Sequence, residues 1–364
     1  MVHGGDIYTE GRLKGRQLLD FSSNINPLGV PGSFTNNIQE AVKNMQVYPD
    51  IQYRQSKEHI CRYLNDGSHF LYPKGKSLNF KFTQEDLVLG NGAGEIIDIA
   101  IASLKSLCIV MPSFVEYKKS AQKNGVKIIY SHLNSNMEID YDDLAQKIQE
   151  VEGLIIGNPN NPNGGVIDQV KFKPILEYCQ KYNKRIIIDE AFIEFTGGLG
   201  ASLLALAQGY SCICMIRALT KFYGMPGIRF GYSICKDRNY NDLMRKRQIP
   251  WNINSFAEIA LQYVLEDYHY VEETLKWIGT ERVGFLRRLK ALEIFEEIYP
   301  TQANFVLVKL ADRSGTALYE KLLKEGILIR ICKNYEGLGD EYIRLAIKSR
   351  KDNLILLQSL SYIM

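Results

Sequence analysis

Short runs of branched apolar residues alternate along the middle of the chain with longer segments that carry apolar residues at every third or fourth position. Continuous apolar runs are typical of strands buried on both faces, and the longer segments are typical of helices that cover such strands. The alternation predicts an α/β fold built on a large, mostly parallel sheet. We expect strands at 87–89, 108–111, 126–130, 154–157, 185–189, 212–216 and 231–235, with helices at 95–107, 113–124, 140–150 and 169–183.

The pattern changes after residue 254. Apolar residues three and four apart predict helix throughout 255–298, and a strand-rich segment with one helix follows it. The first 35 residues are punctuated by Gly, Asn and Pro, which is typical of an extended arm. We therefore predict a large domain over 36–254 and a small α+β domain formed by 1–35 together with 255–364. In the small domain, strands are expected at 303–310, 327–332 and 341–348, around a helix at 314–325.

Composition limits the classes of function. The chain has 364 residues and a net charge of +3, which argues against a strongly basic nucleic-acid-binding protein. Its seven cysteines form no Cys-x-x-Cys pair, and several lie in apolar runs, so they are expected to be reduced thiols. No apolar run approaches the length of a membrane span, and the N-terminus lacks the pattern of a signal peptide. We expect a soluble cytoplasmic protein that contacts neither membrane nor nucleic acid.

Polar residues that follow the predicted strands are the candidates for chemistry, because ligands of such sheets bind at the carboxyl ends of the strands. Gly90-Asn-Gly-Ala-Gly-Glu95 lies between a strand and a helix, where backbone amides can bind a phosphate. Taken alone, the motif is better explained as an ordinary turn between a strand and a helix. Asn158-Pro-Asn-Asn-Pro-Asn-Gly-Gly165 is a rigid loop that presents amide side chains, and Asn161 is its candidate ligand-binding residue.

Two further strand ends carry charged side chains. Asp189 can pair with a cationic ring nitrogen, although the residue alone could also be a metal ligand or a helix cap. The five histidines are scattered, which disfavours a metal site. Lys221 has apolar neighbours, with Arg229 eight residues further on, and both features lower the pKa of an amine as a Schiff-base lysine requires. A solvated surface charge is the alternative for this lysine.

The ordered motifs Gly-Asn-Gly-x-x-Glu, Asn-Pro-Asn-Asn-Pro-x-Gly, Asp-Glu-Ala-Phe, Thr-Lys-Phe and Gly-Ile-Arg-Phe-Gly, over about 90–230, resemble those of fold-type I pyridoxal 5′-phosphate (PLP) enzymes. The resemblance implies the aspartate aminotransferase fold, with a seven-stranded sheet in the large domain. It implies that Lys221 forms the Schiff base with the cofactor and that Asp189 pairs with the pyridinium nitrogen. Asn161 would then bind the phenolic oxygen of the ring.

The same resemblance implies the remaining cofactor contacts. The phosphate would lie on the backbone amides of Ala93 and Gly94, with Thr220 and Arg229 nearby. Tyr117 would stack on the ring, with Phe114 as the second candidate. Members of this family are usually homodimers, and Tyr48 would reach the cofactor of the neighbouring subunit.

The two ends of the chain resemble the threonine-phosphate decarboxylases of cobalamin biosynthesis. The matching segments are His3-Gly-Gly, Leu19-Asp-Phe-Ser-Ser-Asn-Ile-Asn-Pro-Leu-Gly29, Ile249-Pro-Trp-Asn-Ile-Asn254 and Ile329-Arg-Ile-Cys-Lys-Asn-Tyr-Glu-Gly-Leu338. A phosphorylated amino acid has two anionic groups, for which two arginines offer planar forks. Arg344 is the candidate for the carboxylate and Arg330 for the phosphate. Without the resemblance, a solvated charge on the outer face of a strand is the first explanation of each. His3 and Asn24 would close the pocket from the N-terminal arm.

The resemblance implies decarboxylation of L-threonine O-3-phosphate. Histidinol-phosphate aminotransferases share the scaffold, so transamination is the alternative, and serine phosphate is an alternative substrate of the decarboxylase. A PLP-binding regulator without turnover is a third possibility, against which Lys221, Arg330 and Arg344 argue. Phe192 stands where the aminotransferases generally have Tyr, and this difference favours the decarboxylase.

Overall fold

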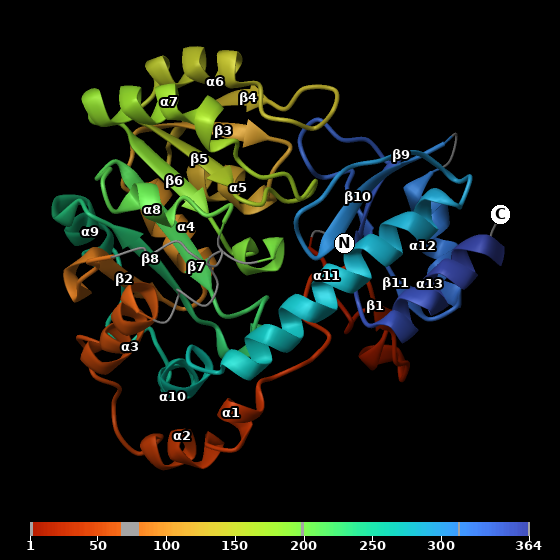
Figure 1. Cartoon of the computed structure of the whole chain (residues 1–364), viewed down its shortest axis with the longest axis horizontal. Helices are drawn as coiled ribbons and strands as arrows, with labels where there is room; N and C mark the ends of the chain where they lie inside the picture. The colour runs from red at the N-terminus through yellow and green to blue at the C-terminus, as the bar shows by residue number, and fades with distance from the viewer. Residues whose placement is uncertain (1–2, 67–79, 198–199, 312–313, 363–364) are drawn as a thin grey trace.

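The computed structural model describes residues 3–66, 80–197, 200–311 and 314–362. A seven-stranded sheet with strand order β2-β8-β7-β6-β5-β3-β4 forms its centre (Figure 1). Only β8 runs antiparallel to its neighbours within this sheet, so the mostly parallel sheet is confirmed. All seven predicted strands are present: β2 (Leu87–Gly90), β3 (Ser106–Met111), β4 (Lys127–His132), β5 (Gly153–Gly157), β6 (Arg185–Asp189), β7 (Ile213–Ala218) and β8 (Gly231–Cys235).

Helices cover both faces of this sheet because successive apolar residues of each strand point to opposite sides. On β6, Ile187 joins the apolar cluster beneath one set of helices, while Ile186 and Ile188 join the cluster on the other side. The first face is covered by α4 (Ala93–Ala102), α5 (Val115–Lys123) and α9 (Arg238–Arg245), and the second by α6 (Tyr141–Lys147), α7 (Gln169–Lys181) and α8 (Leu204–Ala207).

The second structural unit is a four-stranded antiparallel sheet of order β12-β13-β10-β9. It confirms the strand-rich character predicted for the end of the chain. The strand β9, however, lies within the segment predicted to be wholly helical, so that prediction is wrong at its end. Phe295 and Ile298 are three residues apart, a spacing that fits a helix, but pairing with β10 decides the conformation. The elements of this unit are β9 (Phe295–Ile298), β10 (Phe305–Leu310), α12 (Gly315–Lys324), β12 (Arg330–Ile331), β13 (Tyr342–Ala346) and α13 (Arg350–Tyr362).

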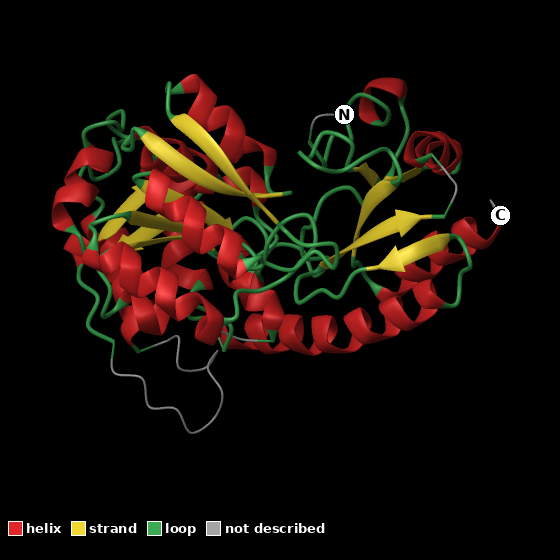
Figure 2. Ribbon diagram, turned by 90° about the horizontal axis from the view of Figure 1, so that it is seen from above, coloured by secondary structure: helices red, strands yellow, loops and turns green. Residues whose placement is uncertain are grey.

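Helix α11 (Tyr268–Lys290) extends from the region of the large sheet to the small sheet (Figure 2). The N-terminal arm lies near the small sheet, because β1 (Leu19–Asp20) pairs in parallel with β11 (Ile327–Leu328), which precedes β12 in the chain. These two strands form a separate two-stranded sheet. The remaining helices are α1 (Gly32–Thr35), α2 (Ile38–Asn44), α3 (Arg54–Asn65) and α10 (Ser255–Val264). The domain boundaries given above remain a prediction. Within the described ranges, no helix is both long and apolar enough to cross a bilayer.

One buried ion pair, between Glu190 and Arg217, connects the carboxyl ends of β6 and β7. Glu190, at the end of β6, accepts hydrogen bonds from Nη2 of Arg217 on β7 at 2.9 Å and from the Ser202 hydroxyl at 2.7 Å. Its other oxygen accepts from the side-chain amide of Asn158 at 3.2 Å, directly after β5. Both charged side chains are essentially inaccessible to water. Removing either partner would therefore leave an uncompensated buried charge.

Replacing Arg217 with Met should lower the free energy of unfolding by about 3–5 kcal/mol, because Glu190 would lose its cation in a water-free environment. Lys173→Met is the matched control, since Lys173 makes an exposed ion pair with Glu177 at 3.7 Å and the same charge is lost. That control should cost less than about 1 kcal/mol. Urea denaturation of the two variants measures the difference. Equal losses would contradict the role assigned to the buried pair.

Candidate functional site

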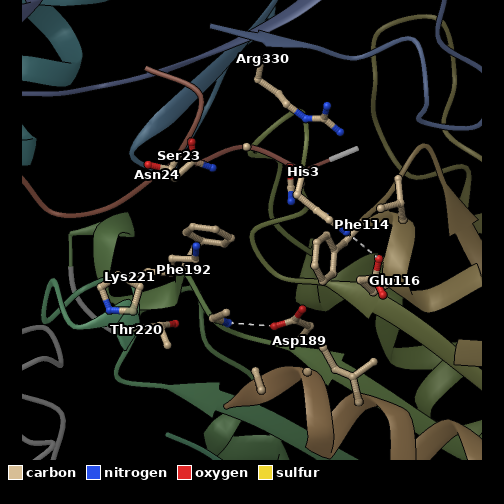
Figure 3. A pocket seen from close by; sticks show the side chains of 18 of the residues that line it. His3, Ser23, Asn24, Phe114, Glu116, Asp189, Phe192, Thr220, Lys221 and Arg330 are labelled. Carbon is tan, nitrogen blue, oxygen red and sulfur yellow. Dashed lines mark hydrogen bonds and ion pairs between the residues drawn. The ribbon is translucent and has the colours of Figure 1, made fainter. Parts of the chain in front are cut away.

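A cavity of about 380 Å³ lies where the carboxyl ends of the large sheet's strands meet the small sheet and the N-terminal arm (Figure 3). It brings together twelve of the thirteen residues that the sequence marks as site candidates. From the large sheet and its loops come Ala93, Gly94, Tyr117, Asn161, Asp189, Thr220, Lys221 and Arg229. From the arm and the small sheet come His3, Asn24, Arg330 and Arg344.

Asp189 lies at the bottom of the cavity as Figure 3 shows it. Its carboxylate accepts a hydrogen bond from the Tyr117 hydroxyl at 2.7 Å and another from the backbone N–H of Ala191 at 3.1 Å. Burial raises the pKa of Asp189, and the two hydrogen bonds partly oppose that rise. A carboxylate placed at such a depth is suited to pair with a cationic group of a bound ligand.

Lys221 follows β7 on the opposite side of the cavity from Arg330. Burial, followed by the positive charges of Arg344 and Arg229, lowers the pKa of its amine to about 8. The amine lies 5.9 Å from the centre of the Phe192 ring, and no hydrogen bond to it is found among the described residues. A substantial neutral fraction at physiological pH makes this amine a nucleophile.

Asn161 is fixed from the side of the small sheet. Its Oδ1 accepts hydrogen bonds from Nη1 of Arg344 at 2.6 Å and from the hydroxyl of Tyr335 at 3.1 Å. With the oxygen so held, the amide nitrogen is the part of the side chain left to donate to a ligand in the cavity. Asn161 therefore links Arg344 to whatever acceptor lies over Asp189.

The turn before α4 has a steric requirement. Gly92 has φ +85°, and a Cβ atom added there would overlap Nη2 of Arg229. Arg229 itself adopts the left-handed conformation, with φ 56°. Its guanidinium thus lies against the N-terminal turn of α4, where free N–H groups and the positive end of the helix dipole already favour an anion. Thr220 adds a hydroxyl to the same wall.

Arg330 and Arg344 are directly opposite each other in the antiparallel pair β12–β13. Residues in that relation project from the same face, with Cβ atoms about 5 Å apart. Two positive side chains in this arrangement repel each other unless an anion lies between or beside them. Both also line the cavity, so the small sheet presents a double cationic surface to a ligand.

The N-terminal arm closes one side. The backbone N–H of Gly5 donates to the Ser22 hydroxyl at 2.7 Å, and a Cβ at Gly4 would overlap the carbonyl oxygen of Ser22. These contacts leave His3 between Arg330 and Phe114 in Figure 3. Asn24 is buried, and among the described residues no partner is found for its Oδ1.

One predicted residue is not in this cavity. Tyr48 is 80% exposed and contacts the ring of Trp251 at 4.8 Å, so its predicted role on a neighbouring subunit stays a prediction. Sequence reasoning missed Tyr335 and Glu116. The first holds Asn161, and the second pairs with His3 at 3.0 Å. Tyr335 lies inside the segment Ile329–Leu338 and Glu116 directly precedes Tyr117, but no spacing rule singles either of them out.

The sequence model of the family "Aminotransferase class I and II" matches residues 16–360. The chain belongs to this family. Its fold type is likewise that of the fold-type I PLP enzymes, as the resemblance predicted. The family match spans the arm, both sheets and the whole cavity apart from the residues before 16.

Relatives within the aminotransferase class I and II family carry different activities in their names. The threonine-phosphate decarboxylase of Salmonella typhimurium is 33% identical, over 99% of this chain and 95% of its own length. The L-serine phosphate decarboxylase of Campylobacter jejuni is 31% identical, over 76% of this chain and 73% of its own length. Among solved structures, the histidinol-phosphate aminotransferase of Clostridium acetobutylicum has a TM-score of 0.88 and 45% identity, and covers 94% of this chain and 98% of its own.

Gly92→Ala should weaken the binding of pyridoxal 5′-phosphate at least about tenfold, because the added methyl group displaces Arg229 from the anion-binding turn and charged hydrogen bonds contribute about 1.5–3 kcal/mol. Gly227→Ala is the control, since Gly227 has no positive φ and no atom within 4 Å of an added Cβ. Titration of the apoprotein, followed by absorbance, compares the two. Unchanged affinity in Gly92→Ala would refute the assignment of the turn.

Proposed function

We propose that this protein is a PLP-dependent decarboxylase of L-threonine O-3-phosphate, giving (R)-1-aminopropan-2-yl phosphate for cobalamin biosynthesis. The observation that carries the proposal is the facing pair Arg330 and Arg344. Two guanidiniums on adjacent strands, on one face of the small sheet, suit a compact ligand whose two anionic groups are a few bonds apart. Threonine phosphate is such a ligand. The names of the relatives from Salmonella typhimurium and Campylobacter jejuni support a phosphorylated hydroxy-amino acid.

The polar groups of the cavity fit PLP. A buried carboxylate suits a protonated ring nitrogen, and a lysine amine of lowered pKa suits an aldehyde. The N-terminal turn of α4, Thr220 and Arg229 suit a phosphate, while the Asn161 amide suits the phenolic oxygen. When bound, this cofactor supplies an electron sink for the bond that breaks at the α-carbon of an amino acid.

The protein's own residues then select the bond and manage the proton. Arg344 would hold the substrate carboxylate, and Arg330 with His3 would hold the phosphate, so the amino acid is fixed at two points. Orientation of this kind decides which bond at the α-carbon is activated. Because the pKa of Lys221 is about 8, its amine can carry a proton to the α-carbon after carbon dioxide leaves.

A histidinol-phosphate aminotransferase is the second candidate, favoured by the name of the Clostridium acetobutylicum structure. In that reaction Arg344 would hold the carboxylate of the amino-acid partner, so Arg344 does not discriminate. Phe192 favours the decarboxylase, since it offers no hydroxyl to the cofactor. Serine phosphate remains a close variant, because one methyl group in a pocket is worth only about 1–3 kcal/mol.

We further propose that the protein works as a cytoplasmic homodimer. Tyr48 supports the dimer, because its ring is exposed on its own chain beside Trp251 and does not contact its own cavity. In a dimer it would complete the neighbour's site. Such an exposed aromatic pair is typical of interfaces.

Incubation of the holoenzyme with O-phospho-L-threonine should release carbon dioxide with no added keto acid. Histidinol phosphate with 2-oxoglutarate should give no glutamate. The two assays separate the candidates, because the decarboxylase needs no amino-group acceptor. Glutamate formation without carbon dioxide would overturn the decarboxylase in favour of the aminotransferase.

The rate at which apoprotein and PLP form a borohydride-sensitive absorption band should rise about tenfold from pH 7 to pH 9 and then level off. The neutral fraction of an amine with a pKa of about 8 grows from about a tenth to about nine tenths over that range. Nα-acetyl-lysine, whose side-chain amine is free, corrects for ionisation of the cofactor in the same buffers. Its amine has a pKa of about 10.4, so its rate should still be rising at pH 9. A reducible band in Lys221→Ala would remove Lys221 from this role.

A further inference from the structure

The first turn of α5 contacts three different parts of the molecule through three consecutive residues. Glu116 pairs with His3 of the N-terminal arm at 3.0 Å. Tyr117 donates to Asp189 inside the cavity at 2.7 Å. Lys118 pairs with Glu336, in the loop between β12 and β13, at 2.6 Å. One turn of helix thus meets the arm, the cofactor end of the cavity and the small sheet.

The two segments that this turn contacts adjoin the proposed anion-binding arginines of β12 and β13. The arm carries His3, which lies beside Arg330 in Figure 3. The loop carries Asn334 and Tyr335, whose side chains fix the two arginines. Nη2 of Arg330 donates to Asn334 at 2.7 Å, and the ring of Tyr335 lies 5.3 Å from the Arg330 guanidinium.

We propose that Glu116 and Lys118 are positioning residues that hold the arm and the 334–338 loop against α5, so that the substrate's phosphate and carboxylate are enclosed together. The inference rests on the proposed function, in which Arg330 and Arg344 bind those anions. Neither residue need touch the substrate. Each acts through a segment on the other side of the cavity.

The energetics suit a closure that opens in every turnover. All four side chains are between 34% and 49% exposed, so each contact changes an equilibrium by only about 1.5- to 5-fold. Burial lowers the pKa of His3, so its contact with Glu116 is chiefly a hydrogen bond at neutral pH, and the Lys118–Glu336 ion pair is the one that weakens with added salt. Opening leaves Glu116 paired, because Lys119 also contacts its Oε1 at 2.8 Å. A buried pair would instead resist opening.

Charge reversal tests the loop contact. In the holoenzyme, Lys118→Glu and Glu336→Lys alone should each increase hydrogen exchange of the 334–338 loop, and Lys118→Glu should weaken O-phospho-L-threonine binding about three- to tenfold. The double reversal restores an attractive pair at unchanged net charge, and should recover both protection and affinity. Loss of affinity should appear in KM more than in kcat.

Lys123→Glu is the matched control. Lys123 lies on the same helix and pairs with Asp98 of α4 at 2.6 Å, but this pair stays on the large sheet's side. The variant has the same net charge as Lys118→Glu, so it reports the long-range effect of charge on an anionic ligand. It should leave exchange of the loop unchanged.

Glu116→Gln tests the arm contact. It should increase hydrogen exchange in residues 4–14, and it should have no further effect on binding in a His3→Gln background. The closure contact is wrong if the single reversals change hydrogen exchange of the 334–338 loop no more than Lys123→Glu does. It is also wrong if the double reversal fails to recover the protection of that loop. Exchange is read without turnover, so a failed decarboxylase assay with recovered protection would refute the proposed reaction and leave the closure standing.

Discussion

The buried pair between Glu190 and Arg217 is the interaction on which the site depends. It joins the ends of β6 and β7 to each other, and through Asn158 it also joins the loop that follows β5. Asp189, Asn161 and Lys221 are each within a few residues of one of these three points. Their relative positions at the cavity are therefore set by a charge cluster that has no contact with the cavity. The residues that line the cavity are thus positioned by buried contacts outside it.

The cavity concentrates positive charge in a chain whose net charge is only +3. Lys221, Arg229, Arg330 and Arg344 line it together, with Asp189 as the carboxylate at its base. Mutual repulsion contributes to the lowered pKa of Lys221, since after burial the largest causes are the charges of Arg344 and Arg229. The same field that attracts an anionic substrate thus keeps the lysine reactive.

Much of this could be predicted from the sequence because two simple rules apply. Continuous apolar runs mark the central strands, and residues directly after parallel strands converge at one edge, which brings Asn161, Asp189 and Lys221 together. Contacts between segments far apart in the chain follow no such rule. Glu116 and Tyr335 depend on where the arm and the small sheet lie over α5. The strand β9 was wrongly predicted to be helix because the three-residue spacing of its apolar residues fits a helix, whereas its pairing with β10 is a long-range contact.

The facing arginines of β12 and β13 have a consequence for the protein without substrate. An anion bound between them would relieve their repulsion, so we expect inorganic phosphate or sulfate to stabilise the folded state by mass action, by about 1.4 kcal/mol at ten times its dissociation constant. The same ions compete with substrate. Solutions that best preserve the protein would therefore raise the apparent KM for its substrate.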